Sequence, residues 1–322
     1  MKLLVTGGAG YIGSIVAQQL LEAGHEVVVL DNLTRGHRAA VPEGATLVEA
    51  DLLDERATSR ALQDGFDGVL HFAALALVAE SVAHPERYHR GNHVGALNLL
   101  DAMRDAGVRR LVFSSTCAVY GEPETVPIKE DVPTAPVNAY GNSKLAADRM
   151  IGDECRAHGL AAASLRYFNV AGARGGLGED HDPETHLIPL VLRAAAGLAD
   201  HVKVLGTDYP TRDGTAVRDY VHVEDLGRAH IMALDAVEPG RHAIYNLGTG
   251  HGYTVKEVVE AARRVTGREI ESREQPRRPG DPPELVAAAD RIRAELGWEP
   301  EKGLEEMIAD AWAWHQAHPD GY

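Results

Sequence analysis

The chain has 322 residues, 44% of them apolar, which is enough to build one large domain or two lobes around a packed core. Its formal net charge of −16 argues against nucleic acid as a partner, because a phosphate backbone needs a basic protein face. No apolar run reaches membrane-spanning length, and a predicted strand starts at Lys2, which leaves no room for a signal peptide. We therefore expect a globular, cytoplasmic protein without nucleic-acid or membrane partners.

The cysteines and histidines make a metal centre unexpected. Cys117 and Cys155 are the only cysteines, so neither a disulfide framework nor a cysteine metal site can be built from them, and we expect two buried thiols. The 16 histidines are scattered and lack the H-E-x-x-H spacing of a zinc enzyme. The sequence thus predicts no metal site.

A glycine loop follows the first predicted strand, at residues 2–6, and precedes a helical pattern that ends near Gly24. Glycines let the backbone approach a pyrophosphate, whose charge then lies against the free amides at the start of a helix. A second apolar strand, 26–30, ends at Asp31, where a carboxylate accepts from ribose hydroxyls and repels a 2′-phosphate. We expect NAD, although Arg35 leaves NADP as the alternative. The predicted contacts here are Gly7, Gly10, Tyr11, Ile12, Gly13, Asp31 and Asn32.

Strands and helices then alternate, with predicted strands at 46–49, 69–72, 110–114 and 162–167. This alternation predicts an α/β fold with a doubly wound parallel Rossmann sheet. Ligands of such sheets bind outside the carboxyl ends of the strands. Turn roles are the alternative for each residue found there; the predicted cofactor contacts are Asp51, Leu52, Phe72, Ala73, Ala74, Asn92, Ser114 and Tyr167.

Tyr140 and Lys144 are four residues apart in a predicted helix, so they share one face and the lysine charge can favour the phenolate of the tyrosine. A phenol titrates near ~10, so a tyrosine base needs such a cation and preferably a second one from the cofactor. Ala147 and Ile151 continue the stripe, which indicates that Lys144 points inward. Thr116, at a strand end, is placed to relay a proton to Tyr140. The competing interpretation is a packed aromatic, a surface lysine and a loop-capping threonine.

After Tyr167 the pattern becomes irregular, and a second lobe is expected to begin. We predict a cofactor domain at 1–167 and a smaller, interleaved α/β substrate-binding lobe at 168–322, with the first sheet re-entered by about 219–247. Helices are expected at 186–196 and 304–315, and strands at 219–223 and 244–246. The candidate anion ligands of this acidic chain are Arg218, Arg277 and Arg278, with surface solubility as the alternative for Arg277.

The motifs together are similar to a known family. T-G-G-A-G-Y-I-G at 6–13, Ser114-Ser115-Thr116, and the Tyr140 to Lys144 spacing resemble the extended short-chain dehydrogenase/reductase family, which includes NAD-dependent epimerases and dehydratases. The strings at 209–215, 218–223 and 318–322 resemble those of its UDP-sugar 4-epimerases. The resemblance spans the whole chain.

The resemblance implies that tightly held NAD takes hydride from C4 of a UDP-hexose while Tyr140 takes the 4-hydroxyl proton, so that UDP-galactose and UDP-glucose interconvert through a 4-keto sugar. It also implies a role in galactose metabolism, a bond from Lys144 to the nicotinamide ribose, and a homodimer formed by the helices at 88–105 and 140–158. By the same resemblance the substrate is held by Thr116, Phe168, Asn169, His186, Leu187, Arg218, Arg278 and Asp281.

Some positions depart from the family pattern or separate it from rivals. Ala76 stands where many members have a cofactor-contacting lysine, His186 replaces a usual asparagine, and Leu285 stands where a tyrosine often borders the sugar. A sugar-nucleotide 4,6-dehydratase needs an acid and a base after Thr116, where this chain has Cys117 and Ala118. Two further functions stay open, an epimerase of N-acetylhexosamine or uronic acid sugars and a non-catalytic NAD-sensing scaffold.

Overall fold

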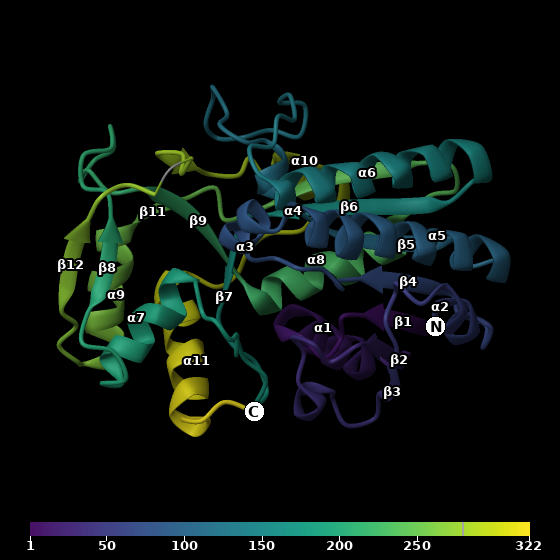
Figure 1. Ribbon diagram of the computed structural model, residues 1–322, viewed down its shortest axis with the longest axis horizontal. Helices are drawn as coiled ribbons and strands as arrows, with labels where there is room; N and C mark the ends of the chain where they lie inside the picture. The colour runs from purple at the N-terminus through teal and green to yellow at the C-terminus, as the bar shows by residue number, and fades with distance from the viewer. Residues whose placement is uncertain (279) are drawn as a thin grey trace.

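The computed structural model describes residues 1–278 and 280–322. Its central layer is a seven-stranded sheet in which every pairing is parallel, in the order β10-β6-β5-β4-β1-β2-β3 (Figure 1). This confirms the predicted doubly wound parallel sheet. Its strands are β1 (Lys2–Thr6), β2 (Glu26–Asp31), β3 (Thr46–Glu49), β4 (Gly68–His71), β5 (Arg110–Thr116), β6 (Ala161–Tyr167) and β10 (His242–Leu247).

Helices cover both faces of this sheet (Figure 1). Successive side chains of a strand point to opposite faces, so Leu3 and Val5 pack with α1 and α8, whereas Leu4 packs with α2, α5 and α6. The apolar side of α5, including Leu99 and Met103, is buried in that second layer. The covering helices are α1 (Tyr11–Glu22), α2 (Glu55–Leu62), α5 (Gly95–Ala106), α6 (Ala139–His158), α8 (Val223–Ala236) and α10 (Asp290–Leu296).

The strand order reverses at β1, which lies between β2 and β4. The chain builds outward from β1 to β3 and then returns to the other side of β1 as β4. Connections that leave β1 and β4 therefore diverge, and a crevice forms at their carboxyl ends. The glycine loop and the segment at Phe72 and Ala73 lie at this crevice.

The second lobe is built around three helices, α7 (Leu187–Ala195), α9 (Val255–Thr266) and α11 (Leu304–Ala317), which share their own buried core. In Figure 1 it lies beside the carboxyl edge of the large sheet. One small sheet joins β7 (Asn169–Ala171), β9 (Val217–His222), β11 (Gly252–Thr254) and β13 (Glu284–Leu285), and a second pairs β8 (Val202–Leu205) with β12 (Ser272–Gln275).

The chain crosses between these two parts more than once. The strand predicted at 244–246 is β10, which pairs with β6 and completes the large sheet. The strand predicted at 219–223 does not re-enter that sheet; it is β9, which pairs with β7, β11 and β13. The chain order explains this: α8 follows β9 and leads back to the large sheet, so the next strand, β10, is the one that joins it. The division of the chain at 167 and 168 stays a prediction.

A π-helical turn interrupts the helix expected at 88–105. The chain forms α3 (Val78–Ala83), α4 (Pro85–Tyr88) and the π-helix η2 (His89–Val94) before α5 begins. The wider turn directs Asn92 to the backbone of Leu75 and to Ser143, which satisfies its buried amide. Single 3₁₀ turns follow β2 and β5, at η1 (Arg38–Ala40) and η3 (Cys117–Val119).

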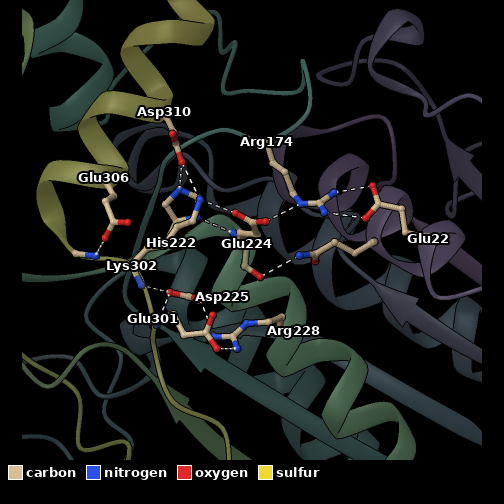
Figure 2. Close-up of polar contacts among 12 residues, drawn as sticks. Glu22, Arg174, His222, Glu224, Asp225, Arg228, Glu301, Lys302, Glu306 and Asp310 are labelled. Atoms are coloured by element: carbon tan, nitrogen blue, oxygen red, sulfur yellow. Dashed lines mark hydrogen bonds and ion pairs between the residues drawn. The ribbon is translucent and has the colours of Figure 1, made fainter.

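A chain of ion pairs fastens the second lobe to the first (Figure 2). Arg174 donates to both carboxylate oxygens of Glu22 on α1, at 2.9 and 2.7 Å, and to Glu224 on α8, at 2.9 Å. Lys302 Nζ lies 2.6 Å from Glu224 and 2.9 Å from Asp310 on α11. Paired geometry of this kind fixes the orientation of the elements it joins.

Among the described residues, the structure contains no helix that combines the length and the apolar character needed to cross a membrane.

Candidate active site

One cavity of about 1110 Å³ lies at the carboxyl ends of the large sheet and against the second lobe. It brings together all but one of the residues that the sequence singled out for cofactor or substrate binding, the exception being Arg277, while the individual roles stay predictions. These residues are Gly7, Gly10, Tyr11, Ile12, Gly13, Asp31, Asn32, Asp51, Leu52, Phe72, Ala73, Ala74, Asn92, Ser114, Thr116, Tyr140, Lys144, Tyr167, Phe168, Asn169, His186, Leu187, Arg218, Arg278 and Asp281.

The glycine loop leaves no space for side chains at two of its positions. Gly7 has φ +72°, and a Cβ there would lie 2.5 Å from the Ala73 nitrogen. A Cβ on Gly13 would lie 2.2 Å from the Gly7 oxygen. Within the described part of the chain, no side chain caps the amides at the start of α1, whose N-cap is Gly10, so they can receive an anion. The loop thus fits the pyrophosphate of a dinucleotide.

Asp31 ends β2 with its carboxylate held at the cavity wall. It is 6% exposed and accepts from the backbone nitrogens of Ala9, at 3.0 Å, and Leu33, at 2.9 Å. Arg35, which could attract a 2′-phosphate, instead donates to the Asp182 carbonyl and lies 3.7 Å from Glu80. This arrangement favours the unphosphorylated ribose of NAD.

Tyr140 and Lys144 lie on the inner face of α6. Asn138 caps this helix by accepting from the Gly141 nitrogen at 2.8 Å. Lys144 is 3% exposed, donates to the Ser114 carbonyl at 2.9 Å and lies 4.9 Å from the centre of the Phe113 ring. The inward direction predicted from the apolar stripe is confirmed. Burial lowers the pKa of Lys144 to about 8.

Over residues 1–278 and 280–322, no hydrogen bond joins the Lys144 ammonium to the Tyr140 phenol, and their pairing stays a prediction. Burial, followed by the neighbouring Tyr167, raises the pKa of Tyr140 above its usual value, and the Thr116 hydroxyl opposes this rise. The Lys144 ammonium donates to the Ser114 carbonyl and has two further donors for other partners. A shared helix face is thus insufficient, and the phenolate depends on the second positive charge that a bound cofactor would supply.

Polar contacts behind α6 fix its position. Asn92 donates to the Ser143 hydroxyl at 3.0 Å and exchanges hydrogen bonds with the backbone of Leu75, so its amide holds the cavity wall together. Asp148, one turn after Lys144, accepts from Ser115 and from the buried Arg166, each at 3.1 Å. These supporting contacts join residues that are far apart in the sequence, so no local sequence motif could predict them.

Arg218 faces the end of the cavity that is predicted to hold the nucleotide sugar. Its guanidinium is tied to Val217 and Pro282 carbonyls, at 2.7 and 2.9 Å, and to the Asp281 carboxylate. Leu285 lies directly opposite Arg218 in the β9 and β13 pairing. The guanidinium is therefore preorganised beside the position where the sequence departs from the family pattern.

Arg277 is not an anion ligand of this cavity, which corrects one of the sequence-based candidates. Its guanidinium lies 4.2 Å from the centre of the Tyr209 ring and donates to Asp208 at 2.6 Å. Those two contacts hold the side chain on the outer surface. Arg278, the next residue, does line the cavity.

The thiol predictions hold for one cysteine. Cys155 is buried, whereas Cys117 is partly exposed and lines the cavity. Burial raises the pKa of Cys117 to about 12, so this thiol stays neutral at physiological pH. With this pKa the thiol gives up its proton far less readily than a carboxylic acid, so it is a poor replacement for the acid that a dehydratase needs at this position.

Sequence reasoning missed a group of charged residues in the wall next to His186. Glu179, His181 and Glu184 line the cavity with it, and their pattern E-x-H-x-x-E-x-H was the available signal. Burial alone would lower the pKa of His186, but Glu179 and Glu184 raise it to about 10. Burial would likewise raise the pKa of Glu179, but His186 and His181 lower it to about 2.

Comparisons with known proteins agree over the full length. Residues 3–248 match the NAD dependent epimerase/dehydratase family. A UDP-glucose 4-epimerase of Streptomyces lividans is 55% identical over 323 residues, spanning 100% of this chain and 98% of that relative. The UDP-glucose 4-epimerase from Bifidobacterium longum, crystallised in complex with NAD+ and UDP, has a TM-score of 0.95 at 37% identity and covers 100% of both chains. The UDP-Glc/GlcNAc 4-epimerase from Campylobacter jejuni has a TM-score of 0.87 at 38% identity, covering 98% of this chain and 99% of that one. The chain belongs to the NAD-dependent epimerase/dehydratase family.

Proposed function

We propose that the chain interconverts UDP-galactose and UDP-glucose by inverting C4 of the hexose, with NAD as its cofactor. One observation carries this proposal: the glycine loop, Tyr140 and Arg218 line the same cavity. A dinucleotide, a proton acceptor and a diphosphate ligand are the parts that such an inversion needs. The full-length relatives named UDP-glucose 4-epimerase support this substrate pair.

The two sides of the reaction are divided between cofactor and protein. The glycine loop and Asp31 would hold NAD, which would supply the hydride acceptor for C4. Tyr140 takes the proton of the 4-hydroxyl, directly or through Thr116, and returns it after the sugar has turned over. Lys144 keeps its charge next to the Ser114 carbonyl and, by family resemblance, bonds the nicotinamide ribose. The substrate passes through a 4-keto sugar with no net oxidation.

Inversion requires that the 4-keto sugar present its other face to the cofactor. This works when the nucleotide is anchored firmly and the hexose loosely, so that binding energy does not hold one sugar orientation. Arg218 and Arg278 are the proposed anchors, with Asp281 orienting Arg218 through their ion pair. Phe168, Asn169, His186 and Leu187 are the proposed remaining contacts.

Two rival functions predict different products. A 4,6-dehydratase would need proton-transfer groups where Cys117 and Ala118 stand, and the thiol is held neutral. A non-catalytic NAD sensor would not need both Tyr140 and Lys144 in the cavity wall.

One experiment distinguishes the three functions. Purified protein saturated with NAD is incubated with UDP-galactose, and the nucleotide sugars are separated by ion-exchange chromatography. We expect UDP-glucose; a 4-keto-6-deoxy sugar would favour the dehydratase, and unchanged substrate the sensor.

We also propose a homodimer in which α5 and α6 pair with their copies. In support, Leu97 on α5 and Val94, the last residue of the preceding π-helix η2, are each 41% exposed. The Arg104 and Glu154 pair, at 3.2 Å, holds the two helices together as one surface. Sedimentation at micromolar concentration tests this, and a monomer there would contradict it.

The cellular setting follows from the same proposal. We infer a cytoplasmic enzyme of galactose metabolism, because UDP-galactose and UDP-glucose are the substrates proposed.

Ala76 lines the cavity where, by family resemblance, many members carry a lysine, so we expect NAD to be held less firmly than is usual. Protein purified without added cofactor should gain activity on addition of NAD, and a full NAD complement after purification would contradict this.

A further inference from the structure

The charged group next to His186 has the composition of a metal site. We call Glu179, His181, Glu184 and His186 the Glu–His cluster. Each offers one ligand atom, and these atoms all lie within 4.8 Å of one another. The cluster lies on the connection between β7 and α7, and His186 directly precedes the first residue of α7. It forms part of the cavity wall at the end assigned to the nucleotide sugar.

The separations within the Glu–His cluster match a four-coordinate ion. Zinc bonds of 2.0 to 2.2 Å arranged as a tetrahedron place neighbouring ligand atoms about 3.3 to 3.6 Å apart. The two Nδ1 atoms lie 3.0 and 2.8 Å from the same oxygen of Glu179. They lie 3.9 and 3.1 Å from the oxygens of Glu184. The separations from Glu179 are thus shorter than the tetrahedral spacing, and those from Glu184 lie on either side of it.

The buried charge of the cluster also calls for a cation. The side chains of Glu179 and Glu184 are 7% and 5% exposed, and two buried carboxylates need a compensating positive charge. Over the described ranges, 1–278 and 280–322, no lysine or arginine forms an ion pair with either carboxylate. The positive charge must therefore come from protonated imidazoles or from a bound ion.

The network in Figure 2 shows the opposite case. His222, Glu224 and Asp310 also form a group of potential ligands. There, however, Lys302 Nζ lies 2.6 Å from Glu224 and 2.9 Å from Asp310, so the chain supplies its own cation. This group needs no metal, which makes it a matched internal control for the Glu–His cluster.

We propose that the Glu–His cluster binds one zinc-class divalent cation through one atom of each of its four residues. Two carboxylates and two neutral imidazoles balance a 2+ ion, and mixed nitrogen and oxygen ligands suit zinc. Four protein ligands close the coordination sphere, so the ion is structural. It braces the segment 179–186 and the entry into α7, and thereby one wall of the cavity. The prediction of no metal site, made from the lack of H-E-x-x-H, is replaced by this proposal.

The test uses the full chain with its cofactor. The protein is stripped with a chelator, dialysed, and titrated with Co(II) and then Zn(II). We expect one equivalent of Co(II) with the intense visible absorption of tetrahedral cobalt, displaced by one equivalent of Zn(II). Weak absorption of six-coordinate cobalt, or no binding at micromolar free metal, would overturn the proposal.

Variants locate the site. Loss of a ligand's supporting group typically weakens metal affinity 10- to 100-fold, so His181→Gln and Glu184→Gln should lose at least about 100-fold. Asp310→Asn, in the group that contains Lys302, and His251→Gln, on the surface, should bind metal as the wild type does. Circular dichroism checks that each variant is folded. The cobalt spectrum of the wild-type protein tests the proposal even if a variant fails to fold. Unchanged affinity in folded His181→Gln and Glu184→Gln proteins would place the metal elsewhere and overturn the proposal.

Discussion

The two ends of the cavity are built in different ways. At the cofactor end, Gly7, Gly13 and Asp31 belong to one strand, loop, helix and strand unit at the start of the chain. At the nucleotide-sugar end, Arg218 and Leu285 come from β9 and β13 and meet only because these strands pair. Local geometry fixes the first end, whereas the packing of the second lobe fixes the other. Substitutions should therefore act on cofactor and chemistry at one end, and on substrate affinity and choice at the other.

The largest effect is expected where chemistry takes place. Tyr140→Phe removes the proposed base without changing the buried ring, so kcat should fall by the ~10² to 10⁴ typical of a lost general base. The variant should fold and retain NAD. Tyr245→Phe is the matched control, because the Tyr245 hydroxyl donates to Glu295 outside the cavity. Near-normal turnover of Tyr140→Phe would remove Tyr140 from the mechanism.

The same division explains what the sequence could predict. The glycine loop, Asp31 and the Tyr140 to Lys144 spacing follow from local rules, and the parallel sheet follows from the alternation of elements. All of the residues chosen in this way line the cavity. Arg277 failed because nothing local reveals that its guanidinium stacks on Tyr209, at 4.2 Å, rather than facing the cavity.

The protonation and charge pairing of the site residues were harder to predict from the sequence than their positions in the fold. Lys144 points inward as the pattern indicates, yet burial and the Ser114 carbonyl determine what its charge does. The strand at 219–223 was predicted to re-enter the large sheet and does not, because the strand pattern alone does not identify the sheet in which a strand pairs. The Glu–His cluster became visible only when a connection without regular structure brought its four side chains together.

A second prediction tests the buried cation at the cofactor end. The pKa of Lys144 is lowered to about 8 from 10.5, so between these values the folded chain is deprotonated while the unfolded chain still binds the proton. The free energy of unfolding should thus rise with pH across this window, by roughly 3 kcal/mol at most. The rise should be absent in Lys144→Met and present in the exposed control Lys256→Met. Denaturant titrations of cofactor-free protein from about pH 7.5 to about pH 10.5 measure it, and parallel profiles would contradict the prediction.

A third prediction separates substrate affinity from chemistry. Arg218→Met removes a charged hydrogen-bonding group worth about 1.5 to 3 kcal/mol, so KM for UDP-galactose should rise roughly 10- to 150-fold, with a smaller change in kcat. Arg212→Met is the control in the same lobe, because Arg212 pairs with Glu257 away from the cavity. An equal fall in kcat and kcat/KM would mean that Arg218 acts in the transition state instead.

A fourth prediction concerns the glycine loop. Gly13→Ala places a Cβ 2.2 Å from the Gly7 oxygen, so the loop must shift. Overpacking of this kind costs about 1 to 3 kcal/mol, which should weaken NAD binding roughly 5- to 150-fold. Gly95→Ala is the control, because its Cβ would meet Leu52 at 3.5 Å, an ordinary contact in a helix. Calorimetric titration of NAD compares them, and equal affinities would show that the loop does not approach the pyrophosphate.

The smallest effect is expected in sugar choice. Leu285 is smaller than the tyrosine that the family resemblance leads one to expect here, and it lies beside Arg218 in the strand pairing, so we expect it to leave room near the hexose. Room permits an N-acetyl group to bind but supplies no affinity, because the amide still needs hydrogen-bond partners once it leaves water. UDP-N-acetylgalactosamine should therefore turn over more slowly than UDP-galactose.

Leu285→Tyr should penalise the N-acetyl substrate more than the plain hexose, because only the former uses the extra volume. At the low end of overpacking, about 1 kcal/mol, the ratio of the two kcat/KM values should change about fivefold. Leu198→Tyr, at a side chain that is 62% exposed, is the control and should leave the ratio unchanged. An unchanged ratio in Leu285→Tyr as well would mean that this side chain does not border the C2 substituent. The choice of sugar would then be set elsewhere in the wall, and the residues next to test are Phe168 and Leu187.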